Sequence, residues 1–230
     1  MKKKKILVVA SHPDDEILGC GGTIAKLSKS GNIIKTIILT RGISSRFDSS
    51  NKKIAKLQKK LNECSKAANK IIGVRNLKFF DLPDNQFDNN SLLFLTKIVE
   101  KEINNFRPQI IFTHFINDLN IDHQYTSKAV LTAARPQNKN SVDEILFFEI
   151  NSSTDYQINS NGLQFLPNYF VDISKTIKFK KKALEIYKSE MKRYPHSRSV
   201  KAVLNRNISI GNSVGLESCE AFQIARIIKK

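Results

Sequence analysis

Five short runs of apolar residues recur along the first 150 residues, and polar side chains hardly interrupt them. Such runs predict strands that are covered on both faces, because a strand with one face in water alternates apolar and polar residues. The predicted strands are KILVVA (5–10), IIKTIILT (33–40), NLKFFD (76–81), QIIFTH (109–114) and EILFFE (144–149).

Between these runs, apolar residues return with the spacing of amphipathic helices. Helices are predicted near residues 21–30, 51–72, 91–105 and 123–134. This alternation of strands and helices predicts an α/β fold, with a Rossmann-like, mostly parallel sheet and helices on both faces.

The pattern changes after residue 150, where residues 151–162 are polar and typical of a long loop. Further helices are predicted near 174–191, 198–208 and 217–228. Because the sequence has no linker and no internal repeat, we expect a single domain over residues 1–230. In this domain an α/β core (1–150) carries a loop and a C-terminal helical cap (151–230).

The chain has 230 residues and a formal net charge of +17. Its lysine clusters are not interleaved with aromatic residues that would stack on bases, so we expect no nucleic-acid partner. A basic field that attracts an anionic small molecule is an alternative to simple surface lysines. No segment has the roughly 18 apolar residues of a membrane helix, and three scattered cysteines indicate no disulfide framework. We expect a cytoplasmic protein, and the sequence leaves open whether it forms a homo-oligomer.

Polar side chains gather after the first and fourth predicted strands. The two groups are His12, Asp14, Asp15 and Glu16, and His114, Asp118, Asp122 and His123. Ligands bind at the carboxyl ends of parallel strands, so we expect the two groups to face each other. Two imidazoles and a carboxylate are the ligand set of a catalytic zinc, and a second carboxylate suits removal of a proton from water. The alternative is that these acidic residues only stabilise the N-terminus of the next helix.

The glycines of GCGGT (19–23) suggest a rival site, a dinucleotide-binding loop. The fingerprint GxGxxG must directly follow the strand, whereas these glycines come later and Ile24 stands at the third glycine position. An NAD(P)-binding oxidoreductase is therefore the weaker alternative, beside a non-catalytic sugar- or nucleic-acid-binding protein. The simpler explanation is that the glycines let a helix pack closely against the sheet.

Two motifs, ASHPDDE (10–16) and DLNIDH (118–123), resemble those of the PIG-L/LmbE-like zinc-dependent N-deacetylases. Segments such as FFDLPDNQFD (79–88), YKSEMKRYPHSRS (187–199) and GNSVGLESCEAF (211–222) extend the resemblance over most of the chain. It implies a Rossmann-like hydrolase that removes the acetyl group from an N-acetylated, N-acetylglucosamine-type sugar.

The resemblance also implies roles for the motif residues. His12, Asp15 and His123 would bind Zn²⁺, for which other divalent ions such as Co²⁺ can substitute. Asp14 would be the general base.

Asn120 departs from the pattern of the family. Many members carry a His there, supported by an Asp at the position of Asp122, and that His stabilises the oxyanion or protonates the leaving amine. Asn can donate a hydrogen bond but supplies no proton at neutral pH. We therefore expect His196, in the cap, to be the acid. His114 is expected either behind the metal ligands or at the rim, and it is the alternative acid. If neither serves, Asp14 would act as base and then as acid.

Further substrate contacts are expected from residues that follow the second and third strands. Arg41 and Arg46 are expected to hold hydroxyls or a phosphate of the substrate, with simple surface solvation as the alternative. Asp81 is expected at the rim, together with Asp84 and Asn85, for which turn formation is the stronger alternative.

Overall fold

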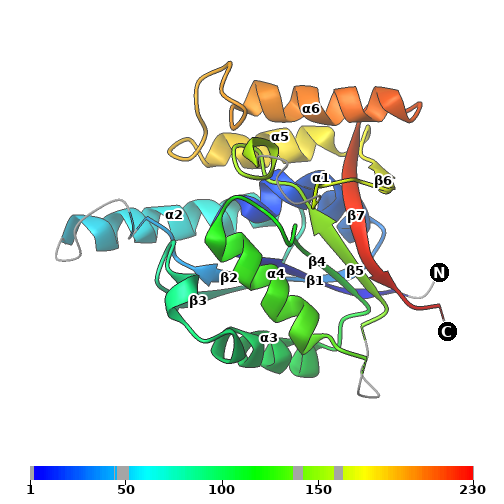
Figure 1. The fold of residues 1–230 in the computed structure, drawn as a ribbon. Helices are drawn as coiled ribbons and strands as arrows, with labels where there is room; N and C mark the ends of the chain where they lie inside the picture. Colours follow the sequence, from blue (N-terminus) through cyan, green and yellow to red (C-terminus); the bar gives the residue numbers. More distant parts are fainter. Residues whose placement is uncertain (1–2, 44, 46–51, 137–141, 158–162, 230) are drawn as a thin grey trace.

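The structure is a computed structural model that describes residues 3–43, 45, 52–136, 142–157 and 163–229. Within these residues, helices cover both faces of one seven-stranded sheet (Figure 1). The strands are β1 (Lys5–Ala10), β2 (Ile33–Thr40), β3 (Asn76–Leu82), β4 (Ile110–His114), β5 (Glu144–Phe148), β6 (Tyr169–Asp172) and β7 (Cys219–Ile227). The helices are α1 (Asp15–Lys29), α2 (Lys52–Ile71), α3 (Leu92–Phe106), α4 (Ile121–Ala133), α5 (Ile177–Ile186) and α6 (Val200–Ser213).

The sheet has the strand order β3-β2-β1-β4-β5-β7-β6. Strands β1 to β5 run parallel, and β7 is antiparallel to both β5 and β6. From β1 the chain proceeds outward to β3 and then returns to β4 on the other side of β1. This reversal makes the crevice between β1 and β4 the topological switch point, where open α/β sheets bind ligands.

Alternate residues of β1 face opposite layers of the fold. Ile6 and Val8 pack in one core cluster with residues of α1, α2 and α5, and Leu7 and Val9 pack in the other with residues of α3 and α4. Figure 1 shows α3 below the sheet and α5 and α6 above it. Burial on both faces explains the uninterrupted apolar run, and the predicted α/β fold class is confirmed.

The predicted helix at 21–30 begins earlier, since α1 starts at Asp15 and is kinked at Cys20, where φ is −146°. A Cβ added to Gly19 would clash with the ring of Phe148, and one added to Gly22 would lie 2.9 Å from Ile173. The glycines therefore allow close packing of α1, as the simpler explanation predicts. They give no support to a dinucleotide-binding loop.

A buried ion pair lies against the kink of α1. Lys180 Nζ of α5 lies 2.6 Å from Glu220 Oε1 of β7 and donates to the carbonyl of Leu18 at 2.8 Å. Glu220 also accepts from the backbone N–H groups of Gly22 at 2.9 Å and Thr23 at 2.6 Å. In an unbroken helix the N–H of Gly22 would bond to the carbonyl of Leu18. The ion pair supplies partners to backbone groups that the kink separates.

The helix predicted at 217–228 is wrong, because Cys219–Ile227 forms β7. Glu, Ala and Arg in this segment favour a helix locally, but the free edge of β5 offers backbone partners, and tertiary pairing overrides propensity. The short strand β6 is not predicted either. The cap therefore contributes α5 and α6 over one face and two antiparallel strands to the sheet.

Candidate metal centre

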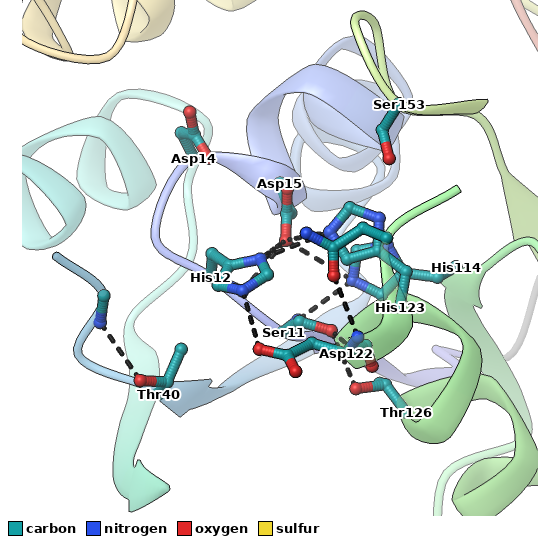
Figure 2. Close-up of polar contacts among 12 residues, drawn as sticks. Ser11, His12, Asp14, Asp15, Thr40, His114, Asp122, His123, Thr126 and Ser153 are labelled. Atoms are coloured by element: carbon teal, nitrogen blue, oxygen red, sulfur yellow. Dashed lines mark hydrogen bonds and ion pairs between the residues drawn. The ribbon is translucent and has the colours of Figure 1, made fainter. Parts of the chain in front are cut away.

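The two polar groups predicted at the strand ends meet at the switch point between β1 and β4. His12 lies in the loop after β1, Asp15 begins α1, and His123 is in the first turn of α4 (Figure 2). Because β1 and β4 are paired neighbours, His12 and His123 are in contact although 111 positions separate them.

Three donor atoms form a nearly equilateral triangle. Nδ1 of His12 lies 3.1 Å from Oδ2 of Asp15 and 3.2 Å from Nε2 of His123, and the latter two atoms are 3.3 Å apart. A tetrahedral zinc site with bonds of about 2.0 Å has donor atoms about 3.3 Å apart. Oδ1 of Asp15 is buried without a hydrogen-bond partner among the described residues. The donor set therefore fits one face of a tetrahedral zinc site.

The carboxylate of Asp122 holds the imidazole of His12 from the other side. Oδ2 of Asp122 lies 3.0 Å from Nε2 of His12. Asp122 is fixed in turn by the backbone N–H groups of Asn85 at 2.7 Å and Phe87 at 3.0 Å. A carboxylate in this position sets the orientation of a ligating histidine and its tautomer.

Asp118 plays the same part for the second imidazole. Its Oδ1 lies 3.0 Å from Nδ1 of His123, and its carboxylate accepts hydrogen bonds from the hydroxyls of Ser153 and Thr154. Both histidines therefore turn one nitrogen toward the triangle and the other toward a buried carboxylate.

The surrounding carboxylates favour positive charge at this place. Burial lowers the pKa of His12, but hydrogen bonds with Asp122 and Asp15 outweigh it and raise the pKa to about 10. Burial also lowers the pKa of His123, and the charges of Asp15 and Asp118 raise it to about 9. A divalent cation would supply the same positive charge in place of the protons, as metal binding to histidine requires.

Asp14 points away from Asp15 and the triangle (Figure 2). Its backbone has a φ of 105°, in the left-handed region that non-glycine residues seldom adopt. Its buried carboxylate lies 3.2 Å from Nη1 of Arg198. Burial raises the pKa of Asp14 to about 8, and the charge of Arg198 opposes this rise.

A cavity of about 130 Å³ adjoins these groups. Its polar lining residues are His12, Asp14, Asp84, Asn85, Asn120, His123, Ser152, Ser153, Glu190 and Arg198. This lining is rich in hydrogen-bonding groups, which suits a polar ligand.

Three residues expected at the substrate or at the rim do not line the cavity, namely Arg41, Asp81 and His114. Arg41 donates to Asp81 at 2.7 Å, and this exposed pair lies outside the cavity. His114 is fully buried, and its ring stacks on that of His123 with centroids 3.9 Å apart. Of the two expected places, it takes the one behind the metal ligands and not the rim. Arg46 lies outside the described residues.

The cap reaches the cavity as expected, but through a different residue. His196 is exposed, and its Nδ1 accepts from the backbone N–H of Arg198 at 3.1 Å. The side chain of Arg198 enters the cavity, where its Nε donates to Ser152 Oγ at 3.0 Å. In this structure His196 therefore does not line the cavity, and its role as the acid stays a prediction. Arg198 does not take over the role of acid, because a guanidinium stays protonated.

Asn120 lines the cavity and is also the N-cap of α4. Its Oδ1 accepts from the backbone N–H of Asp122 at 2.8 Å, and its Nδ2 donates to Oδ1 of Asn85 at 3.0 Å. Asn is among the preferred residues for an N-cap, which gives it a structural role here.

Sequence reasoning missed Arg198, Glu190 and Tyr187. Glu190 lines the cavity and is 4% exposed, and Tyr187 donates its hydroxyl to Glu16 at 2.7 Å. All three lie in the YKSEMKRYPHSRS segment, which the resemblance includes without indicating which side chains point inward.

Comparisons with known proteins find similar sequences that include deacetylases. Residues 7–134 match the PIG-L family, described as GlcNAc-PI de-N-acetylase. The chain is 30% identical over 200 residues to the diacetylchitobiose deacetylase of Thermococcus kodakarensis, and the match covers 81% of this chain and 70% of that protein.

Two solved structures share the whole fold. The conserved protein TT1542 from Thermus thermophilus matches with a TM-score of 0.76 and 22% identity, covering 99% of this chain and 97% of that one. GalB, the 4-carboxy-2-hydroxymuconate hydratase of Pseudomonas putida KT2440, matches with a TM-score of 0.74 and 19% identity, covering 99% of each chain. Since a hydratase has the same fold, the fold alone does not decide the reaction.

None of the helices in the described part of the chain is long and apolar enough to cross a membrane. The family match spans more than half of the chain and contains the loop after β1 and the start of α4. The predicted resemblance is confirmed, and the chain belongs to the PIG-L family.

Proposed function

We propose that the protein is a zinc-dependent N-deacetylase that removes the acetyl group from an N-acetylglucosamine-type sugar. The observation that carries the proposal is the triangle of His12, Asp15 and His123 with the carboxylate of Asp14 beside it. Membership of the PIG-L family supports the reaction, and the similarity to a diacetylchitobiose deacetylase supports the sugar.

His12, Asp15 and His123 would hold the ion, while Asp122 and Asp118 keep the two imidazoles in position. When bound, zinc polarises an acyl carbonyl and lowers the pKa of water to about 7.

Asp14 takes the proton from the attacking water at its carboxylate. A C–O bond then forms at the acetyl carbon and the C–N bond breaks, which yields acetate and an amine. Among the described residues, the cavity lining includes no histidine besides His12 and His123. Asp14 therefore returns its proton to the leaving nitrogen and serves as base and then as acid.

Metal analysis and an acetate-release assay on N-acetylglucosamine and N,N′-diacetylchitobiose test this proposal. Asp14→Asn should keep zinc but lose about 10²- to 10⁴-fold in turnover, since it removes the base. His123→Ala should lose the metal. The control is Asp81→Asn, because Asp81 is exposed and lies outside the cavity. This variant should change neither the zinc content nor the turnover. A wild-type protein that binds no divalent ion, or a fully active Asp14→Asn, would refute the proposal.

The same assay distinguishes the role of Arg198 from that of His196. Arg198→Ala removes the ion pair with Asp14 and should lower turnover at least tenfold, and added guanidinium ion should restore part of it. His196→Ala should keep turnover within about twofold, because His196 is exposed outside the cavity. The reverse result would return the role of acid to His196.

An anionic substrate is the second part of the proposal. The formal charge of +17 supports it, because a basic surface raises the rate of encounter with anions. The kcat/KM of a phosphorylated N-acetylated sugar should then exceed that of the neutral sugar, and the advantage should shrink as salt rises. Equal rates at low salt would contradict this part alone. Co²⁺ is expected to support activity in place of zinc.

A further inference from the structure

Glu16 is a buried carboxylate directly behind the reaction centre. It is 1% exposed and does not line the cavity. Its Oε2 accepts from the backbone N–H of Asp14 at 3.0 Å. Its Oε1 accepts from the hydroxyl of Tyr187 at 2.7 Å and from the side-chain amide of Asn69 at 2.8 Å. Glu16 therefore links the backbone of Asp14 to two other parts of the fold.

The backbone of Asp14 needs such support. Its φ of 105° is costly for a residue with a Cβ, and such conformations persist only where the surroundings over-determine them. In this conformation, Asp14 and Asp15 point in different directions although they are adjacent (Figure 2). One carboxylate faces the cavity and the other faces the donor triangle. The roles of two consecutive aspartates thus depend on one unusual backbone angle.

The two anchors of Glu16 come from separate helices. Asn69 belongs to α2, and Tyr187 is the C-cap of α5. Both are almost fully buried, with exposures of 1% and 0%. The carbonyl of Tyr187 also accepts from the N–H of Glu190 at 2.9 Å, and Glu190 lines the cavity. The network therefore joins the loop after β1 to the cap.

Packing alone does not account for a carboxylate at this position. A buried carboxylate is costly unless hydrogen bonds compensate it, and an apolar side chain of similar size would fill the space without that cost. What a carboxylate adds at Glu16 is an acceptor for the N–H of Asp14 and for the donors of Tyr187 and Asn69.

We propose that Glu16, anchored by Tyr187 and Asn69, is a positioning residue that holds Asp14 in its left-handed conformation and so keeps its carboxylate at the cavity. The inference rests on the proposed role of Asp14 as the base. It follows that a tyrosine that lines no part of the cavity controls turnover.

Tyr187→Phe tests this inference, because it removes one hydroxyl from a buried ring. We expect kcat to fall about tenfold with KM and zinc content unchanged, since small misplacements of a reacting group are costly. Glu16→Met should lower kcat about a hundredfold, and Glu16→Gln should be intermediate because it keeps an acceptor for Asp14. The control is Val99→Ala in α3, which removes buried atoms in the other core cluster. It should lower the melting temperature but leave kcat unchanged.

Amide hydrogen exchange at Asp14, measured by NMR on the metal-free protein, gives a readout that needs no activity. Tyr187→Phe and Glu16→Gln should speed this exchange, and Val99→Ala should not. Unchanged exchange with unchanged kcat would overturn the inference, and so would a fall in kcat matched by an equal loss of zinc. A wild-type protein that releases no acetate would refute the proposed function. Amide hydrogen exchange at Asp14 would still decide whether Glu16 fixes the backbone of Asp14.

Discussion

The ion pair of Lys180 and Glu220 provides a strong test of the fold, because both side chains are buried to within 2% exposure. Lys180→Met removes one charge and keeps a similar volume. Among the described residues, the carboxylate of Glu220 then keeps the two backbone N–H groups of α1 as hydrogen-bond donors but has lost its cation. The carbonyl of Leu18 loses its donor. This is the situation in which breaking a buried pair is most costly.

Removing one partner of a buried ion pair costs about 3–5 kcal/mol, and we expect this loss of unfolding free energy for Lys180→Met. For a chain of this size, each kcal/mol lowers the melting temperature by about 2–4 °C, so the expected fall is roughly 6–20 °C. The double variant Lys180→Met/Glu220→Gln leaves no unpaired charge. It should be at least as stable as either single variant.

Urea unfolding of the metal-free protein, followed by circular dichroism, measures these free energies. The control is Lys97→Met, because Lys97 is 65% exposed in its pair with Glu100. That variant should stay within about 0.5 kcal/mol of the wild type. A loss below about 1 kcal/mol for Lys180→Met, or single losses that simply add in the double variant, would refute the reasoning.

Two further predictions concern buried carboxylates. Asp118→Asn weakens the partner of His123 and should lower zinc affinity about 10- to 100-fold in a competition titration with a chelator. Unchanged affinity would contradict its supporting role. For Glu102, burial opposes ionisation, but Lys35 and Lys78 at 2.5 Å each outweigh it and lower its pKa. Its stabilising effect is therefore present above the unfolded pKa and lost as pH falls through the folded one. The stability difference between wild type and Glu102→Gln should shrink from pH 6 to pH 3, and a constant difference would contradict this.

The sequence predicts the five parallel strands closely, and in β1, β2, β4 and β5 burial on both faces leaves the local signal. Ile6 to Val9, for instance, are apolar without interruption and fully buried. β7 has no such signal. Its residues Gln223 to Ile227 are half-buried, and only the pairing with β5 and β6 makes the segment a strand.

The same contrast holds within the candidate site. His12, Asp14 and Asp15 lie within four positions at one strand end, and the rule that ligands bind at carboxyl strand ends relates them to His123. Arg198 comes from the cap, whose placement depends on how α5 and α6 pack. A local sequence pattern contains no information on that packing. It therefore could not indicate that Arg198, and not His196, enters the cavity.

The pairing of β1 with β4 has a consequence for the order of events in folding. Ile6 pairs with Ile110, whereas the β1–β2 pairing joins residues as near as Lys5 and Ile33. Contacts that close long loops carry a larger entropic cost and are associated with slow folding. His12 follows β1 and His123 follows β4, so the two histidines meet only when β4 pairs with β1. A chain in which only β1 to β3 have assembled therefore lacks one of the three proposed metal ligands. The rate at which a refolding chain acquires tight zinc binding would therefore report the docking of β4 on β1.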